Sequence, residues 1–430
     1  MTNDGSSLSA YKVELEKVLT EGIIPFWLKR SVDREYGGFL TCFDEHGNAL
    51  PDTAKYLVTQ TRMIWGFSYL YGRCPSVLRP DMKSAAERGT EFFMSKFWDE
   101  KYGGFVWKTG RDGSVLDSGK LVYGQSFAIY ALAEYYRFSG DRRALDLAER
   151  TFDLLQVYAA DTLCGGYFEN LEADWKPAGG GKYAGDRKSL DIHMHLMEAY
   201  TTLYAASGRE IHGRKLKEII DLLLGRMINT ELGYAYNQFD REFRRIPAIN
   251  IYRTWNDERE AGETIKEPLD TTSYGHNVEL SWLLKLAMDT LGREDPACTA
   301  VMKKLLDHSL QYGFDYEYGG VYRDGFADQK ALVTDKEWWQ NFEALAGYSN
   351  GYLCFGDPRY LDALVRTWSF VRDKFINAET GESRQLLRRN GEPVAANMGN
   401  PWKGIYHTGR ALAVCGDRLG RIIEKAKAGV

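Results

Sequence analysis

Histidines are scarce in this chain, and their placement is uneven. Of the seven histidines, four stand near the start of apolar segments with helical periodicity. These four are His193, His195, His276 and His407. The others have the pattern of surface or helix-flank positions, and they are His46, His212 and His308. An imidazole exchanges a proton close to neutral pH, so several imidazoles at equivalent places indicate general acid–base chemistry.

Other unusual polar and aromatic residues occupy corresponding positions of the remaining apolar segments. They are Arg62, Tyr123, Glu279, Trp338, Trp339, Glu343 and Trp402. Glu279 lies one helical turn after His276, a spacing suited to a carboxylate that orients an imidazole and raises its basicity. Indole and phenol rings suit sugars because axial C–H groups pack on the ring face while the hydroxyls form hydrogen bonds. Large helical cores also use aromatic residues, so a structural role for these rings stays open.

Several other chemistries lack their sequence patterns. The chain has no HExxH, no GxSxG, and no Walker or GxGxxG segment that follows a strand and opens a helix. His193 and His195 point about 200° apart on a helix, so they cannot face one ligand together. A metal would need His195, His276 and His407 together, and no spacing demands it. We therefore expect no metal and no cofactor, while Glu279 and Glu343 stay open as a glycosidase-type carboxylate pair.

A turn signature recurs six times along the chain and indicates how these residues are positioned. An Asp or Asn precedes a Gly by four residues at 33/37, 99/103, 161/165, 229/233, 315/319 and 377/381. Asp and Asn bond to their own backbone, Gly accepts a positive φ, and a short strand then follows. Apolar helical stretches end at Gly72, Gly140, Gly208, Gly292, Gly356 and Gly416, where Gly is the expected residue after a helix. Each unit thus predicts a β-hairpin, a helix, a turn and a second helix.

Six such units predict an all-α fold, an (α/α)6 barrel with short β-hairpins at one end. We expect a single catalytic domain over residues 1–430, with an insertion at about 239–272. The helix expected from about residue 9 to 29 has no hairpin before it, so it can pair with the last helix near Arg418. The first helix of each unit should line the interior, and the unusual polar residues at the helix starts should then converge.

The composition of the chain excludes some classes of binding partner. The net charge is −5 without a basic block, so we expect no nucleic-acid partner. No apolar run approaches the roughly 18 residues that span a membrane, and the N-terminal residues have no apolar signal-peptide region. The six cysteines are widely spaced without a CxxC pair, which is typical of free thiols in a reducing cytoplasm. We expect a cytoplasmic monomer or homodimer.

Four motifs carry a family resemblance. SYGHNVE, KEWWQNFEA, HMHLMEAY and WKGIYHTGR resemble those of the N-acylglucosamine 2-epimerase superfamily, closest to its cellobiose and mannose 2-epimerases. The resemblance spans nearly the whole chain and includes the YGGF turns. The chain differs from the family pattern at Asp191, where Asn is usual, and at Asn277, Ile405 and Thr408. These differences concern the choice of sugar rather than the proton chemistry.

The resemblance implies cofactor-free epimerisation at C2 of a reducing-end aldose. By motif, His276 and His407 are the general acid and base on opposite faces of C2, and Arg62 binds the sugar near O5 or the enediolate oxygens. His195 assists, for example in ring opening, and Glu279 orients His276. Substrate contacts are implied for Tyr123, His193, Trp338, Trp339, Glu343 and Trp402.

Three other functions remain open. An aldose–ketose isomerase of the same superfamily would use the same histidines and return the proton to C1. A glycoside hydrolase or lyase on the same barrel would depend on Glu279 or Glu343 more than on His407. A carbohydrate-binding or scaffold protein would bind a sugar without turnover.

Overall fold

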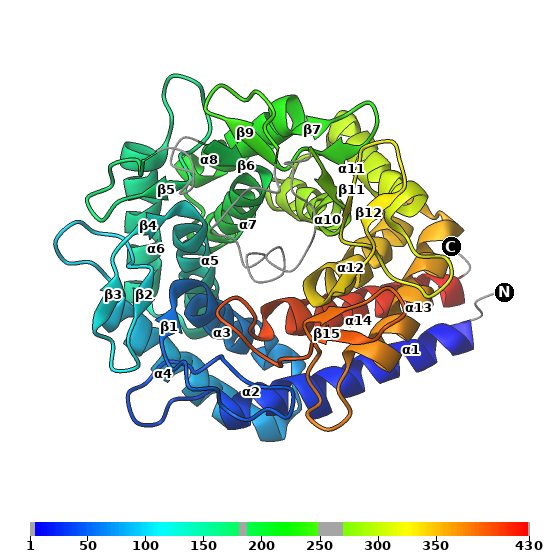
Figure 1. The fold of residues 1–430 in the computed structure, drawn as a ribbon, viewed down its shortest axis with the longest axis horizontal. Coiled ribbons are helices and arrows are strands. Elements are labelled where there is room, and N and C mark those ends of the chain that lie inside the picture. The colour runs from blue at the N-terminus through cyan, green and yellow to red at the C-terminus, as the bar shows by residue number, and fades with distance from the viewer. Residues whose placement is uncertain (1–4, 180–186, 248–269, 429–430) are drawn as a thin grey trace.

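Two concentric sets of helices surround the centre of the molecule (Figure 1). The computed structural model describes residues 5–179, 187–247 and 270–428. The inner helices in these ranges are α3 (Leu57–Leu70), α5 (Val122–Ser139), α7 (Leu190–Ser207), α10 (Tyr274–Thr290), α12 (Trp338–Phe355) and α14 (Ile405–Ala428). Each contacts the next, and α14 contacts α3, so the ring is closed. The (α/α)6 barrel is confirmed.

The outer helices each pack one apolar stripe against this ring. They are α1 (Gly5–Lys17) with α2 (Ile24–Arg30), α4 (Arg79–Lys96), α6 (Arg142–Leu154), α8 (Glu210–Leu222), α11 (Pro296–His308) and α13 (Pro358–Phe370). In α6 the buried residues include Leu145, Ala148 and Phe152, a spacing that gives one buried face. The inner helices are buried on nearly all sides, which explains their continuous apolar sequences.

The first and last helices close the ring together. α1 contacts α14, as the unpaired N-terminal helix predicted, although a π-helical turn (Val18–Ile23) separates α1 from α2. Similar π-helical turns follow α6, α8, α11 and α13, over Leu155–Ala159, Leu223–Met227, Ser309–Gly313 and Val371–Phe375. Short 3-10 turns occupy Tyr71–Arg73 and Ser76–Leu78 between α3 and α4.

The helix-ending glycines are confirmed at four inner helices and wrong at the last. Gly140, Gly208 and Gly356 follow α5, α7 and α12 in the left-handed conformation, and Gly292 lies just after α10 with φ of 63°. Gly72 lies in a 3-10 turn. Gly416 lies inside α14, because the outer partner of α14 is α1 from the other end of the chain and no turn is needed.

Short antiparallel strands lie at one end of the barrel and link neighbouring units. One sheet joins β1 (Lys55–Tyr56), β2 (Lys108–Thr109) and β3 (Val115–Asp117), and another joins β10 (Thr272–Ser273), β11 (Asp324–Gly325) and β12 (Ala331–Val333). A third joins β13 (Lys336–Glu337), β14 (Leu386–Leu387) and β15 (Pro393–Ala395). The pairs are β4 (Lys120–Leu121) with β5 (Asn170–Leu171), β6 (Arg187–Ser189) with β9 (Gln238–Asp240), and β7 (Ile228–Asn229) with β8 (Tyr234–Ala235). Most of the expected insertion, residues 248–269, lies outside the described residues.

All six predicted turns are present. In each, the Gly N–H donates to the carbonyl of the Asp or Asn four residues earlier, as Gly37 does to Asp33 at 3.0 Å. The second glycine of the pair permits a close approach. A Cβ on Gly38 would lie 2.7 Å from Oε1 of Gln60, and its φ is 66°.

A buried lysine fastens these turns to the inner helices. Lys55, Lys120, Lys188 and Lys336 each stand in the strand before an inner helix and donate to the turn aspartate, Asp33, Asp99, Asp161 and Asp315, at 2.7 to 3.0 Å. Each ammonium side chain is fully buried. Lys336 also donates to the Gly319 carbonyl, and burial lowers its pKa to about 8.

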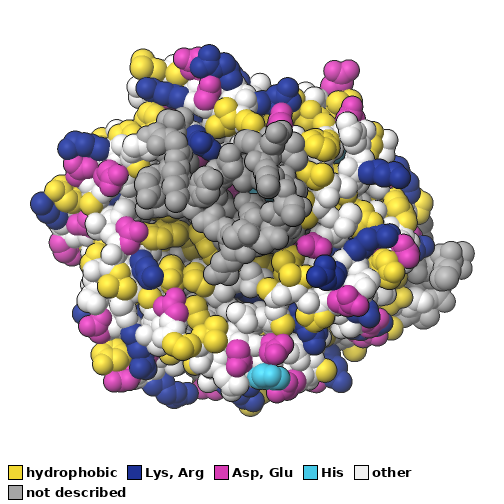
Figure 2. Space-filling model, viewed as in Figure 1, with side chains coloured by type: hydrophobic (Ala, Val, Ile, Leu, Met, Phe, Trp, Pro, Cys, Tyr) yellow, Lys and Arg dark blue, Asp and Glu magenta, His cyan; other side chains and the backbone are white. Residues whose placement is uncertain are grey.

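Surface and thiol features agree with the composition. On the face in Figure 2, Lys and Arg are interspersed with Asp and Glu around the rim, without a large region of one sign among the described residues. No helix in the described ranges is both long and apolar enough to cross a membrane. All six cysteines are free, and four are buried, namely Cys42, Cys74, Cys298 and Cys415.

Removing one of the buried lysines should be costly. We expect Lys55→Met to lower the free energy of unfolding by about 3–5 kcal/mol, because Asp33 would remain as a buried acid with only Arg111 beside it. Urea unfolding followed by circular dichroism measures the change. The control is Lys285→Met, which removes a surface pair with Asp289 and should cost less than about 1 kcal/mol. Equal costs for both variants would contradict the structural role of the buried pair.

Candidate active site

The two histidines expected to flank a substrate both pack against one indole. The ring centroid of Trp339 on α12 lies 4.6 Å from that of His276 on α10 and 5.8 Å from that of His407 on α14. All three residues belong to the first turns of inner helices, at the end of the barrel that carries the strands. His276 is 19% exposed and His407 is 7% exposed by side chain.

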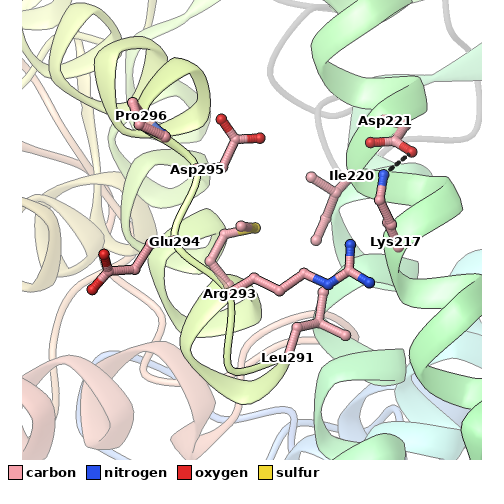
Figure 3. Close-up of a pocket in the computed structure, with 9 residues that line it drawn as sticks. Lys217, Ile220, Asp221, Leu291, Arg293, Glu294, Asp295 and Pro296 are labelled. Carbon is pink, nitrogen blue, oxygen red and sulfur yellow. Dashed lines mark hydrogen bonds and ion pairs between the residues drawn. The ribbon is translucent and has the colours of Figure 1, made fainter.

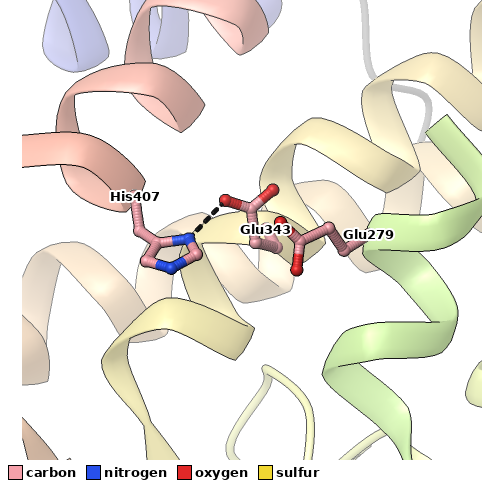
Figure 4. A group of neighbouring side chains, drawn as sticks. All are labelled: Glu279, Glu343 and His407. Atoms are coloured by element: carbon pink, nitrogen blue, oxygen red, sulfur yellow. Dashed lines mark hydrogen bonds and ion pairs between the residues drawn. The ribbon is translucent and has the colours of Figure 1, made fainter. Parts of the chain in front are cut away.

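His407 is oriented by Glu343. The carboxylate Oε1 lies 2.8 Å from Nδ1 of His407, as Figure 4 shows. With Nδ1–H donated to Glu343, Nε2 of His407 carries the lone pair that can accept a proton. Burial, with the nearby positive charges of Arg62 and Arg410, holds the pKa of His407 well below its ordinary value. His407 is thus a neutral imidazole near pH 7.

Glu279 does not orient His276, which corrects the role implied by the resemblance. Its carboxylate accepts from Nη2 of Arg410, and its other oxygen is buried without a hydrogen-bond partner. Spacing on the helix places Glu279 one turn from His276, but the guanidinium between neighbouring helices offers it a stronger, charged partner. Burial and the charge of Glu343 raise the pKa of Glu279 to about 8, against the opposing effect of Arg410.

Arg410 joins three buried carboxylates. Its guanidinium donates to Glu198, Glu279 and Glu343, and also contacts the hydroxyl of Tyr406. Single ligand atoms of Glu279, Glu343 and His407 lie within 4.8 Å of one another, a separation that a metal ion could bridge (Figure 4). The positive guanidinium already occupies both carboxylates there, so the expectation of a metal-free site stays our prediction.

His195 lies between two carboxylates of its own helix. Nδ1 lies 2.9 Å from Oε2 of Glu198 and Nε2 lies 3.3 Å from Oδ1 of Asp191. Burial alone would lower the pKa of His195, but these two carboxylates outweigh it and raise the pKa to about 9. The same Asp191 oxygen lies 3.6 Å from Nε2 of His276, whose pKa is lowered by burial. His195 is therefore an imidazolium and His276 a neutral imidazole near pH 7.

Arg62 and its partners adjoin His195. Arg62 donates to the hydroxyl of Tyr123 at 2.8 Å and to the carbonyl of Trp402, and its guanidinium lies over the ring of Phe127 at 4.5 Å. The ring of Tyr123 meets that of His195 edge-on at 5.2 Å. The Trp402 ring lies 5.9 Å from that of Tyr123. The structure thus brings these three predicted residues into contact with the histidine group.

The two indoles of α12 differ in their surroundings. Trp339 donates from its indole N–H to Glu337 at 2.7 Å, which fixes the ring that both histidines contact. Trp338 is only 2% exposed and meets His407 edge-on at 6.4 Å. Trp338 therefore packs against the imidazole of His407 as part of the site wall. Its burial leaves it little surface on which a sugar could stack.

His193 has a structural role instead of the implied substrate contact. Its Nε2 accepts from the N–H of Tyr167 at 3.0 Å, and Nδ1 bonds to the Ser189 carbonyl at 2.8 Å. Both ring nitrogens are engaged, and the side chain is fully buried. The residues that clamp other hairpins in the same way are Gln60, Gln125, Asn277 and Asn341. Each of these four residues stands five positions after the first residue of the strand that precedes its inner helix. This constant spacing is a signal that the sequence alone contains.

Two further histidines, expected at surface or helix-flank positions, are buried on outer helices. His212 is fully buried, with Nδ1 bonded to the hydroxyl of Ser207 at 2.7 Å. His308 is 3% exposed and its Nε2 lies at the carbonyl of Ala327. Both sit on outer helices, where the buried stripe accepts a ring whose polar atom finds a local partner. His46 is exposed, as expected.

Sequence reasoning missed Glu198 and Arg410, and it noted Asp191 only as a departure from the family pattern. Glu198 follows His195 by three residues, and Arg410 follows His407 by three residues. The same spacing drew attention to Glu279, so a search for charges one turn after each histidine would have found both. Asp191 precedes His195 by four residues, the other spacing that places two side chains together on a helix.

A separate pocket lies at the far end of α10 (Figure 3). It has a volume of about 420 Å³ and lies between α8 and the turn that joins α10 to α11. Its lining includes Lys217, Met288, Leu291, Arg293 and Asp295. His276 begins the same helix at the opposite end, so this pocket is remote from the histidine group.

The assembled group supports proton transfer at carbon. It offers two neutral imidazoles beside one indole, an imidazolium, and a guanidinium able to stabilise a developing oxyanion. Removal of a weakly acidic C–H proton needs a base together with stabilisation of the anion that forms. Both are present at one end of the barrel.

Comparisons with known proteins agree with this chemistry. A model of the family described as N-acylglucosamine 2-epimerase matches residues 38–411. A cellobiose 2-epimerase of Bacteroides fragilis is 30% identical over 424 residues, which cover 95% of this chain and 98% of the relative. The structure of cellobiose 2-epimerase from Spirochaeta thermophila has a TM-score of 0.82 at 28% identity, with 98% of this chain and 99% of that chain covered. A D-mannose isomerase structure is similar in fold, with a TM-score of 0.79 at 21% identity and coverage of 98% and 99%.

The clamp role of His193 gives a stability prediction. We expect His193→Gln to change the free energy of unfolding by less than about 1 kcal/mol, because the amide oxygen can accept from Tyr167 as Gln125 accepts from Phe105. His193→Ala leaves the buried N–H unpaired and should cost about 1–3 kcal/mol. Thermal and urea unfolding measure both variants. A Gln variant as unstable as the Ala variant would refute the equivalence of the two clamps.

Proposed function

The chain belongs to the N-acylglucosamine 2-epimerase family, and from this premise we propose that it interconverts the C2 epimers of a reducing-end glucose or mannose unit. The unit is part of a cellobiose-type β-1,4 disaccharide or is the free sugar. The enzyme is an isomerase that uses side chains alone. The relatives named above act on such sugars by their descriptions, and the histidine group carries the chemistry that the reaction needs.

One observation carries the proposal. His276 and His407 come from helices far apart in the sequence, yet both pack on Trp339 and both have lowered pKa values. Inversion at C2 needs one group to remove the proton from one face and another to return a proton to the opposite face. Two imidazoles beside a common ring meet this need when the sugar lies against Trp339, provided that the second ring takes up a proton before it acts as the acid.

The proposed reaction proceeds through an enediolate. One imidazole removes the proton at C2 of the open-chain sugar, and the negative charge moves to O1. Arg62 lies where its charge can stabilise that oxygen, next to Tyr123 and His195. The negative charge of the enediolate favours protonation of the second imidazole from the solvent, and this imidazolium then protonates C2 from the other face. The proton gained by the first imidazole returns to the solvent. General acid–base catalysis supplies roughly 10²–10⁴-fold, and charge stabilisation must add the remainder.

The glycosidase alternative conflicts with the position of the carboxylates. Inverting glycosidases separate their two carboxyl groups by about 6.5–9.5 Å and retaining ones by about 5–5.5 Å. Glu279 and Glu343 have oxygens within 4.8 Å of each other, are fully buried, and share the guanidinium of Arg410. Their burial and their bonds to Arg410, rather than their separation, argue against a role on either side of a glycosidic bond. The isomerase alternative uses the same histidines and is distinguished by its product.

We also propose a cytoplasmic enzyme that works as a monomer or homodimer. The six unpaired thiols fit a reducing compartment. Size-exclusion chromatography with light scattering determines the oligomeric state.

Product analysis tests the function. The protein is incubated in deuterium oxide with cellobiose, lactose, mannose, glucose and N-acetylglucosamine, and products are resolved by NMR. We expect a C2 epimer labelled with deuterium at C2 from at least one sugar. A fructose-type ketose as the main product would favour the isomerase, and binding without any exchange at C2 would refute catalysis.

The two histidines should both be essential. We expect His276→Ala and His407→Ala each to lower kcat/KM by at least about 10²-fold, because each removes one of the two proton-transfer groups. Circular dichroism checks that the variants fold. His46→Ala, an exposed position, is the control and should retain full activity. Activity above a few per cent in either folded variant would contradict the two-base assignment.

The pKa shifts predict the pH profile. A base must be unprotonated, so activity is lost as pH falls through the pKa of His276 or His407, both below the ordinary value of 6.5. An acid must be protonated, so activity is lost as pH rises through the pKa of His195, about 9. We expect a plateau in kcat/KM between these limits. An acidic limb with its midpoint above pH 6.5 would contradict the neutral imidazoles.

A further inference from the structure

One carboxylate of the site has no role in proton transfer at C2. Asp191 lies in the first turn of α7, and its Oδ1 is 3.3 Å from Nε2 of His195 and 3.6 Å from Nε2 of His276. Its side chain is 40% exposed, whereas that of His195 is 3% exposed. Asp191 is thus the accessible member of a carboxylate–imidazole pair.

The pair carries a complete acid and base. Nδ1 of His195 bonds to Glu198, which Arg410 and Tyr406 hold in turn, so the ring of His195 is fixed with Nε2 toward Asp191. Asp191 and Glu198 together keep His195 protonated, and the bond to His195 lowers the pKa of Asp191 against the effect of burial. The resting pair is therefore an imidazolium donor beside a carboxylate acceptor.

Reducing sugars need such a pair before any chemistry at C2. In water an aldose is almost entirely a closed hemiacetal, and its C2 proton becomes acidic only when C1 is a carbonyl. Ring opening removes the proton from the O1 hydroxyl and adds a proton to O5. Both oxygens are bonded to the same carbon, so the base and the acid must stand side by side.

We propose that Asp191 and His195 form a ring-opening dyad that gives this protein a second activity, the interconversion of the α and β anomers of a reducing sugar. Asp191 accepts the proton of the O1 hydroxyl, the C1–O5 bond breaks, C1=O1 forms, and Nε2 of His195 donates its proton to O5. Closure on the other face of C1 reverses each transfer and gives the other anomer. The dyad ends as it began, so no oxidant or co-reactant is needed.

The resting protonation states of Asp191 and His195 are also restored without the solvent when the open sugar goes on to react. Asp191 then holds a proton and His195 lacks one, and the 3.3 Å contact between Oδ1 and Nε2 lets the proton return directly. The inference rests on the proposed function in one respect, that a reducing sugar is the ligand. It does not depend on the C2 chemistry, so the two activities are separable.

The test separates them in one sample. His407→Gln, which lacks a base for C2, is mixed with D-mannose in deuterium oxide, and exchange between the two anomeric proton signals is measured by exchange NMR. We expect anomer exchange at least about tenfold faster than with heat-denatured protein, and no formation of the C2 epimer. Adding Asp191→Asn to this variant should return the exchange to the background, because an amide accepts no proton. Asp289→Asn in the same background is the matched control and should change nothing.

Each outcome decides one of the two proposals. Background exchange in the folded His407→Gln variant, with mannose binding shown by saturation-transfer NMR, overturns the dyad while leaving C2 epimerisation by the unmodified protein intact. Persistent exchange after Asp191→Asn overturns it as well. If the unmodified protein exchanges anomers but never the C2 proton of any sugar, the proposed function fails and the dyad stands. Should His407→Gln not fold, Asp191→Asn is compared with the unmodified protein in the same measurement.

Discussion

The buried lysine–aspartate pair beneath the hairpins is the interaction on which the rest of the structure depends. Each lysine stands immediately before an inner helix, and each aspartate closes the turn of the hairpin below it. In alternate units an arginine from the next hairpin adds a second cation, as Arg241 does to Asp161 and Arg389 does to Asp315. A buried acid between two cations has few alternative positions, because any displacement would leave a charge uncompensated in a medium of low dielectric. The start of the inner helix is fixed accordingly.

The fixed start of each inner helix determines where the side chains of the proposed site lie. Asp191 follows Lys188 by three residues, and Trp339 follows Lys336 by three. His407 follows by four residues another buried lysine, Lys403, which pairs with the buried Glu382. The site residues therefore lie within one helical turn of an anchored position, where fraying of the helix would otherwise be greatest. Reactive groups held to a fraction of an ångström are the condition for effective proton transfer.

A second constraint couples the two sides of the site. Arg410 bonds to Glu198, the partner of His195, and to Glu343, the partner of His407. Burial and the charge of Glu343 raise the pKa of Glu279. At Glu198 the charges of Arg410 and His195 outweigh burial and lower the pKa to about 2. The cluster accommodates an imidazolium at His195 and a neutral ring at His407 at once. Two imidazoles in one site thus reach opposite charge states.

The features that could be predicted depend on local signals in the sequence. The features that could not be predicted depend on partners far away along the chain. The turns, the inner helices and the prominence of His276 and His407 follow from glycine positions, apolar periodicity and polar residues at helix starts. The role of His193 could not be read from its own helix, because it depends on the Tyr167 N–H of the preceding hairpin. Glu279 was misassigned for the same reason, since Arg410 lies 131 positions away. Gly416 was misread because the partner of its helix is at the other end of the chain.

That partner has a consequence for biosynthesis. Ribosomes synthesise α1 before α14, so the contact between these two helices forms only after α14 has been made. The same helix brings His407 and Arg410. A nascent or truncated polypeptide with five-sixths of the ring therefore lacks both one of the two proposed bases and the guanidinium that bonds to three carboxylates. The helix that closes the barrel also completes the proposed site. We therefore expect activity only from a chain whose whole barrel has folded.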